Sequence, residues 1–241
     1  MDIVYLVKND PDNDSEELRY SLRSLKNIPH NKVVIVGEKP DWVTNVIYIS
    51  VAQSGTKNVN VANNLRAAVA SNLVADDFLL MNDDFFFMKK IPEMPNLNFG
   101  LLKNVIQTYD IRYPEGSDYI RQMKNAYRVL IEAGYEQPLS YELHMPMILN
   151  KQRATSLFEE VTTPIYQFRT YYGNYAQLGG VTVPDVKIFI EPKHNDHVYT
   201  DNPISYLENM TFLSVTGGSF KRGIPGDFVK SKLQDKSVYE L

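Results

Sequence analysis

Four short apolar segments, separated by polar or amphipathic stretches, constrain the fold of this 241-residue chain more than any other feature. Each is too short for a typical helix and lacks helical spacing, so each predicts a buried strand. The segments are Ile3 to Val7, Lys32 to Gly37, Asn45 to Val51 and Phe78 to Met81. With helices expected from Glu16 and from Val61 to Leu73, the order predicts an α/β fold: a mostly parallel, twisted sheet flanked by helices.

The sequence changes in character after Lys90, and its later part is expected to be more irregular. Helices are predicted from Asn104 to Ile111, from Tyr119 to Ala133 and from Gln152 to Val161. Tyr166 to Gly180, rich in Tyr and Gly, predicts an irregular loop, Val186 to Glu191 a late strand, and Ser231 to Leu241 a tail. Because no clear interdomain linker is found, we expect a single domain over residues 1–241, with halves at 1–92 and 93–241.

The fourth predicted strand runs directly into Asn82-Asp83-Asp84, which is followed by three phenylalanines. Ionised carboxylates are costly to bury unless something pairs with them, so both are expected at the carboxyl end of the strand, where open α/β sheets bind ligands. A right-handed crossover would place the end of the first strand, and the loop at residues 8–14, beside them. A divalent cation holding a diphosphate would suit this pair, but Asn and Asp are also ordinary turn residues.

Each of the other candidate residues has a functional and a structural interpretation. Arg19 and Arg23, four apart, could bind phosphate oxygens or form a solvated helix face paired with Glu16 or Glu17. His144 could be a metal ligand, a general acid or base, or a structural histidine. Arg169, between aromatic residues, could hold a phosphate or stack on rings. His194 and His197 have only a loose metal-ligand spacing, and a solvated loop is favoured.

Composition and charge exclude several classes of protein. The formal net charge of −4 gives no general attraction for nucleic acid or anionic membranes, although a local basic groove stays open. Without cysteine there is no disulfide framework and no thiolate metal site. The first residues do not have the pattern of a signal peptide, and no apolar run is long enough to span a bilayer. A cytoplasmic protein is expected.

Several stretches, taken in order, resemble the Stealth family of capsular-polysaccharide sugar-phosphate transferases, whose relatives include the catalytic region of N-acetylglucosamine-1-phosphotransferase. The resemblance is strongest over the first 90 residues, where Glu17 to Ser24 and Leu79 to Phe86 match family motifs. Further similar elements are Met1 to Tyr5, Pro40-Asp41-Trp42, His144-Met145-Pro146, Arg169 and Ser237 to Glu240.

The resemblance implies a GT-A-like nucleotide-sugar fold, a divalent metal (Mn²⁺ or Mg²⁺) and functional roles for Asp83, Asp84, His144 and Arg169. We predict a metal-dependent glycosyltransferase that uses a nucleotide-diphosphate sugar and a polysaccharide or other hydroxyl acceptor. Residues 1–92 would bind the donor, and residues 93–241 would supply acceptor and catalytic groups. The predicted roles are metal binding by Asp83 and Asp84, catalysis by Asp84, His144 and Arg169, and substrate binding by Arg19, Arg23, Asn64, Asn82 and Glu142.

Three alternatives stay open. Attack at the β-phosphorus instead of the anomeric carbon would transfer sugar-1-phosphate, as the Stealth resemblance suggests. The acceptor could be DNA carrying modified bases, which the acidic net charge does not favour. A binding module without turnover is the non-enzymatic alternative, and the intact Asn82-Asp83-Asp84 argues against it.

Overall fold

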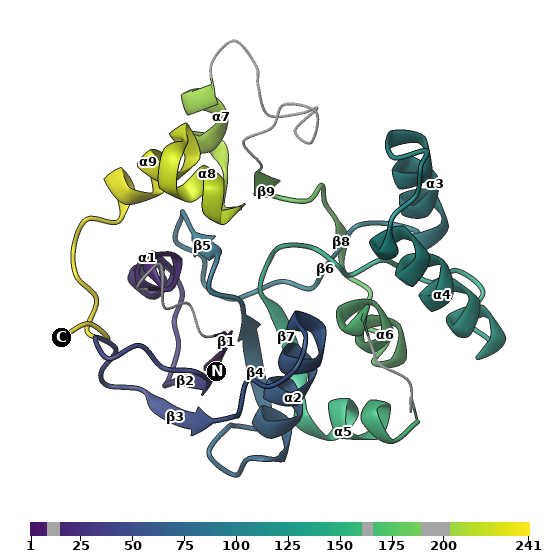
Figure 1. Cartoon of the computed structure of the whole chain (residues 1–241), viewed down its shortest axis with the longest axis horizontal. Coiled ribbons are helices and arrows are strands. Elements are labelled where there is room, and N and C mark those ends of the chain that lie inside the picture. Colours follow the sequence, from purple (N-terminus) through teal and green to yellow (C-terminus); the bar gives the residue numbers. More distant parts are fainter. Residues whose placement is uncertain (9–14, 161–165, 189–202) are drawn as a thin grey trace. The chain divides into compact units, whose positions relative to one another are not determined.

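The computed structural model describes residues 1–8, 15–160, 166–188 and 203–241 (Figure 1). These residues form two compact units. The first comprises Met1–Met94, His144–Ile148 and Val186–Leu241, and the second comprises Pro95–Leu143 and Leu149–Asp185. The first unit therefore takes in the whole of the predicted first half, residues 1–92, and also the end of the chain. Within the described ranges, no helix has both the length and the apolar character needed to cross a membrane.

The main sheet has five strands in the order β3-β2-β1-β4-β7. The strands are β1 (Asp2–Val7), β2 (Val33–Gly37), β3 (Ile47–Ser50), β4 (Asp77–Met81) and β7 (Met147–Asn150). Strand β1 pairs in parallel with both β2 and β4, with Val4 opposite Val34 and Leu80. The predicted α/β fold with a mostly parallel sheet is confirmed, and the carboxyl ends of β1 and β4 lie side by side as expected.

Two helices of the first unit pack on the main sheet or on the strand that follows it. Helix α1 (Glu16–Ser24), continued by a short 3₁₀ turn (Leu25–Asn27), buries Leu18 and Leu22, as the leucine spacing predicts. Helix α2 (Lys57–Ala70) packs against β1 and β2. The helix begins four residues before the predicted start at Val61. The sequence pattern missed this first turn because it is exposed and lacks apolar periodicity: Val59 is 41% exposed and Val61 is 42% exposed.

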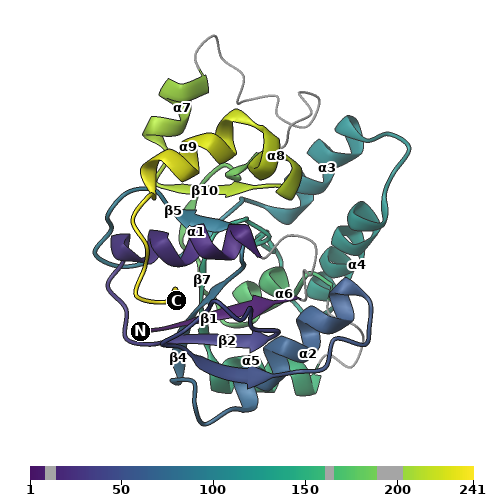
Figure 2. The same ribbon diagram turned by 60° about the vertical axis from the view of Figure 1, so that its left-hand side comes forward.

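A second sheet of the first unit follows the order β5-β10-β9, with β5 (Phe85–Phe87) antiparallel to β10 (Phe212–Val215) and β9 (Lys187–Ile188) parallel to β10. Helices α7 (Pro203–Asn209), α8 (Gly217–Arg222) and α9 (Ile224–Lys232) complete this part, and Figure 2 shows α8 and α9 lying over β10. Phe86, Phe220 and Phe228 belong to its apolar core. The first two residues of the predicted tail, Ser231 and Lys232, belong to the last turn of α9. Residues 189–191 of the predicted late strand lie outside the described residues.

The second unit contains a short parallel pair, β6 (Leu97–Asn98) and β8 (Val181–Thr182), and helices α3 (Leu102–Arg112), α4 (Asp118–Glu132), α5 (Lys151–Glu160) and α6 (Phe168–Tyr175). The helices α3, α4 and α5 confirm the sequence prediction to within two residues over the described range. The irregular loop predicted from Tyr166 to Gly180 was wrong, because α6 occupies its centre.

Helix α6 forms in a Tyr- and Gly-rich segment because tertiary packing outweighs its weak helix propensity. All six residues from Arg169 to Asn174 are buried. At Gly173 a Cβ atom would lie 2.3 Å from the ring of Tyr141, so only glycine allows this ring to pack directly on the helix. The glycine is therefore a packing residue of a buried helix, and its presence does not mark a loop.

Candidate functional site

The residues Asn82 to Phe85, here called the acidic turn, connect β4 to β5. The backbone N–H of Phe85 donates to the carbonyl of Asn82 at 3.3 Å, which closes the turn. Helix α1 fixes the following strand, because Ser21 Oγ donates to the carbonyl of Phe85 and the N–H of Phe87 donates to Ser24 Oγ. The segment is therefore both a turn and the carboxyl end of a central parallel strand, so the two sequence interpretations are compatible.

Asp84 is held by an ion pair that the sequence analysis did not predict. Its Oδ2 accepts from Nζ of Lys187 on β9, and the two side chains are 22% and 10% exposed. The same Nζ donates to Ser214 Oγ at 3.1 Å and to the carbonyl of Val215 at 3.4 Å. The other oxygen of Asp84, Oδ1, is buried and has no hydrogen-bond partner among the described residues. One half of this carboxylate is paired and the other half is not.

The carboxyl group of Asp83 has a raised pKa. Burial, together with the negative charges of Asp84 and Glu17, raises the pKa of Asp83 to about 7, while the nearby positive charges of Lys8 and Lys187 act in the opposite direction. Burial is the largest of these causes, so the ionised form of Asp83 is disfavoured, and a cation bound beside it would stabilise that form. Strongly perturbed carboxyl groups of this kind are more common at functional sites than elsewhere.

Asn64 lies on α2 beside the ends of β1 and β2, and it is 2% exposed. Its Nδ2 donates to the carbonyl of Val7 at 3.5 Å and its Oδ1 accepts from Gln53 Nε2 at 2.9 Å. Gly37 ends β2 with a φ of +110°, and a Cβ there would lie 2.2 Å from the carbonyl of Val7. Asn64 thus ties α2 to the sheet edge, and its predicted contact with a donor stays a prediction.

Arg19 and Arg23 lie on α1 and contact Glu240 near the end of the chain; we call Arg19, Arg23, Ser237 and Glu240 the Glu240 cluster. Arg23 Nε and Nη2 donate to the two carboxylate oxygens, each at 2.8 Å, and Arg19 Nη1 lies 3.4 Å from Oε2. Arg19 also stacks over the ring of Trp42, 3.9 Å from its centroid. Glu16, one partner proposed from the sequence, pairs with Lys230.

The Glu240 carboxylate is fully satisfied. Besides the arginines, the N–H and Oγ of Ser237 donate to Oε1, at 2.9 and 3.1 Å. Burial alone would raise the pKa of Glu240, but the hydrogen bonds from Arg23 and Ser237 and the charge of Arg23 outweigh it and lower the pKa to about 2. A phosphate would have to replace this carboxylate to bind both arginines.

The remaining predicted site residues are divided between the units. His144 belongs to the first unit with the acidic turn, whereas Glu142 and Arg169 belong to the second. Glu142 Oε1 accepts from the backbone N–H of Thr170 at 3.1 Å, in the first turn of α6. Arg169 is 9% exposed on the same helix. The catalytic roles of His144 and Arg169 and the substrate role of Glu142 stay predictions.

The acidic turn offers two adjacent carboxylates as ligands for a divalent cation. No group of three or more His, Cys, Asp or Glu residues that could hold a metal occurs in the ranges that the structure describes. His194, Asp196 and His197 lie outside those ranges. Mg²⁺ is commonly held by one or two carboxylates together with substrate phosphates. Asp83 and Asp84, with the unpartnered Oδ1 of Asp84, fit such a shared ion, provided that Lys187 gives up its contact.

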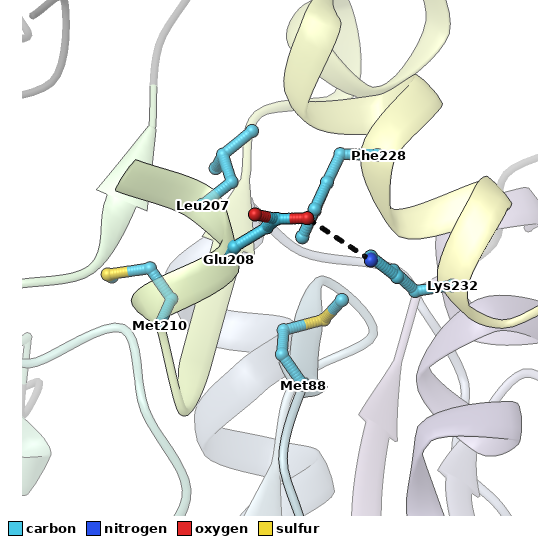
Figure 3. A pocket seen from close by; sticks show the side chains of 6 residues that line it. All are labelled: Met88, Leu207, Glu208, Met210, Phe228 and Lys232. Carbon is cyan, nitrogen blue, oxygen red and sulfur yellow. Dashed lines mark ion pairs between the residues drawn. The ribbon is translucent and has the colours of Figure 1, made fainter. Parts of the chain in front are cut away.

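A separate pocket lies in the first unit between β5, α7 and α9 (Figure 3). It has a volume of about 290 Å³ and is lined by Met88, Leu207, Glu208, Met210, Phe228 and Lys232. Glu208 and Lys232 form an exposed ion pair at 3.6 Å. Its lining includes none of the predicted site residues, and its volume falls at the lower end of ligand pockets, so we do not assign the chemistry to it.

Comparisons with known proteins do not assign a family. No family model and no curated protein matches the sequence. Among solved structures, mouse xyloside xylosyltransferase 1 in its apo form overlaps with a TM-score of 0.45 and 12% identity, over 90% of this chain and 99% of that chain. The galactosyltransferase LgtC, in complex with donor and acceptor sugar analogues, gives 0.48 and 11% over 99% and 97%. At these scores the overlaps assign neither a fold family nor an activity, and the Stealth resemblance stays a prediction.

Proposed function

We propose that this chain is a transferase of GT-A-like fold that transfers a sugar from a nucleotide-diphosphate sugar to a hydroxyl acceptor. The observation that supports it most is the acidic turn: two adjacent carboxylates at the carboxyl end of a central parallel strand, one with a buried oxygen lacking a partner. Ligands of open α/β sheets bind at this edge. Buried polar atoms without partners are rare and call for an explanation, such as an ion that binds there.

In this proposal Asp83 and Asp84 would hold a divalent cation, which when bound supplies positive charge to the donor diphosphate. Lys8, which follows β1 directly and whose charge acts on Asp83, would add positive charge on the same edge. His144, in the same unit, would accept the proton of the acceptor hydroxyl. The phosphate-binding role of Arg169, which belongs to the second unit, stays a sequence prediction. We assign Arg19 and Arg23 to Glu240 and not to the donor, because Glu240 occupies their bidentate positions.

The Stealth-like motifs favour sugar-1-phosphate transfer as a second candidate. Both reactions need the same donor site, and they differ in whether the acceptor oxygen attacks the anomeric carbon or the β-phosphorus. The released nucleotide separates them, since glycosyl transfer releases a nucleoside diphosphate and sugar-1-phosphate transfer releases a nucleoside monophosphate. Chromatography of the released nucleotide therefore decides between them.

The first experiment measures thermal stability with UDP-, GDP-, ADP- and CMP-sugars, with and without Mn²⁺. We expect one donor together with Mn²⁺ to raise the melting temperature, because a ligand that binds only the folded state stabilises it. Asp84→Asn should abolish this shift and lower product formation at least about 100-fold, an effect typical of removing one electrostatic contact to a transition state. Asp235→Asn, at an exposed ion pair with Lys26, is the control and should behave as wild type.

If no donor shifts the melting temperature and no nucleotide is released, the proposal is wrong. A donor-dependent shift without released nucleotide, in the presence of a range of saccharide acceptors, would identify a binding module. Loss of the shift in Asp235→Asn as well would show that the effect does not arise at the acidic turn.

A further inference from the structure

The side chain of Lys187 is less exposed than those of five other ion-paired lysines that the structure describes. These five, Lys26, Lys32, Lys124, Lys230 and Lys232, have side chains that are 27–54% exposed, whereas the side chain of Lys187 is 10% exposed. Its ammonium carries three donors, and the three acceptors are Asp84 Oδ2, Ser214 Oγ and the carbonyl of Val215. An ammonium removed from water to this extent needs a negative partner, and Asp84 provides it.

The sheet fixes this ammonium at the acidic turn. Lys187 lies directly opposite Ser214 in the parallel β9–β10 pair, and Ser214 lies opposite Phe85, the residue after Asp84, in the antiparallel β10–β5 pair. The register of two adjacent strand pairs therefore brings Lys187 to Asp84. Rotation of the lysine side chain can break the contact, but the backbone keeps the ammonium within reach of the turn.

The same carboxylate is the one that a divalent cation would need. One oxygen of Asp84 is on Lys187, and the other is buried without a partner. A cation that binds Asp84 must therefore overcome the repulsion of a nearby ammonium or displace it, and the lost ion pair counts against metal affinity. We propose that Lys187 is the resident counter-ion of Asp84 and competes with a divalent cation for this carboxylate.

This inference builds on the proposed function and adds an order of binding to it. Without a donor, Lys187 neutralises Asp84 and the free metal binds weakly. A diphosphate that arrives with the metal brings negative charge of its own, and the displaced ammonium can pair with it. Lys187 would then be a positioning residue of the donor site: it suppresses metal binding until the diphosphate is present.

The test measures Mn²⁺ affinity in the absence of any nucleotide, by calorimetry or by electron paramagnetic resonance of the free ion. Lys187→Met keeps a side chain of similar length and removes the charge. We expect it to bind Mn²⁺ at least about tenfold more tightly than wild type, which corresponds to about 1.4 kcal/mol. Lys32→Met is the matched control, because Lys32 pairs at 3.5 Å with the buried Asp2 at the opposite end of β1. Its Mn²⁺ affinity should equal that of wild type.

A second variant guards against misfolding. Lys187→Gln keeps hydrogen-bonding capacity beside Ser214 and Asp84 and should also increase the Mn²⁺ affinity. The double variant Asp84→Asn/Lys187→Met removes both charges, so it should fold and bind no Mn²⁺ at this position, which would locate the ion. Circular dichroism checks the fold of each variant.

The outcomes separate this inference from the proposed function. Equal or weaker Mn²⁺ binding in both folded single variants overturns the inference, even if wild type releases nucleotide from a sugar donor. Failure of every form to bind Mn²⁺ at millimolar concentration also overturns it. Tighter binding in the single variants supports it, even if no sugar nucleotide is a substrate. A second expected result is that UDP increases Mn²⁺ affinity more in wild type than in Lys187→Met, where there is no ammonium to displace.

Discussion

The first unit contains two groups of acidic and basic side chains that differ in how completely they are satisfied. In the Glu240 cluster, both oxygens of one carboxylate are bound by arginines and by Ser237, and the pKa of Glu240 is lowered to about 2. In the acidic turn, one oxygen of Asp84 has no hydrogen-bond partner in the described structure, and the pKa of Asp83 is raised to about 7. Both regions border α1 or the strand it holds, so the difference does not arise from their distance to the core.

This difference in how completely the carboxylates are bound distinguishes a cluster that stabilises the fold from a candidate ligand site. A carboxylate that is paired and hydrogen-bonded on all sides favours its charged form, and it stabilises the fold that holds it. Adjacent carboxylates that repel one another and leave a buried oxygen without a partner cost stability unless a ligand neutralises them. We infer that the Glu240 cluster fixes the last residues of the chain on α1, and that the acidic turn binds a ligand.

The largest effect is expected when the Glu240 cluster is broken. Glu240→Gln removes the charge that pairs with Arg23, which is itself only 10% exposed. Removing one partner of a buried ion pair costs roughly 3–5 kcal/mol, so the free energy of unfolding, measured with urea, should fall by about that amount. A change below about 1 kcal/mol would contradict the distinction between the two clusters.

The same variant has a pH signature. Because the pKa of Glu240 is lower in the folded state, its stabilisation is present above the unfolded value near 4.5 and is lost as the pH falls towards 2. The difference in unfolding free energy between wild type and Glu240→Gln should therefore be largest near neutral pH and should shrink below pH 4.5. A difference independent of pH would mean that packing and not charge is responsible.

A smaller effect of opposite sign is expected at the acidic turn. The pKa of Asp83 is raised on folding, so its ionisation lowers stability as the pH rises from about 4 to 7. In EDTA, Asp83→Asn should be more stable than wild type by about 1 kcal/mol at pH 8, less than the full shift implies because solvent screens a half-buried group. The two proteins should converge at pH 4. Thermal denaturation at both pH values checks this, and lower stability of the variant at pH 8 would contradict it.

The smallest effect is expected at Arg19. Its side chain is 22% exposed, and its guanidinium lies 3.4 Å from Glu240 and stacks on Trp42. Arg23 alone can hold both oxygens of Glu240, so Arg19→Gln should cost no more than about 1 kcal/mol, the range of exposed ion pairs and cation–π contacts. Urea denaturation of Arg19→Gln beside Arg23→Gln checks the ranking. An equal loss in both would show that Glu240 needs the two arginines together.

The sequence predicted the acidic turn because its signal is local: an apolar strand that ends in carboxylates. It did not predict Lys187, since its position depends on the pairing of β9, β10 and β5, strands that are far apart in the chain. Nor could it identify Glu240 as the partner of Arg23, because nothing local joins positions 217 residues apart. The sequence analysis instead proposed Glu16 or Glu17 as partners of the two arginines, because these residues are neighbours on the same helix.

The prediction of the fold was also limited to features that are local in the sequence. Strands β1, β2 and β4 are buried apolar runs, and their order in the chain was enough to predict parallel pairing. Helix α6 was missed because tyrosine and glycine are weak helix formers, and the residues that stabilise it lie elsewhere: Asn174 bonds the backbone of Leu139, and Tyr141 packs on Gly173. Tertiary contacts of this kind override propensity.

The separation of Arg23 from Glu240 has a consequence for synthesis on the ribosome. Arg23 emerges early, and 217 further residues must be translated before its carboxylate exists. A nascent chain can already have produced β1, β2 and β4 while α1 still lacks the partner that fixes it, so chaperones meet an intermediate with an unfinished surface. A product that terminates between Leu233 and Glu240 contains every strand of the parallel sheet yet lacks this charge pair, so we expect it to unfold more readily and to be degraded faster than the full chain.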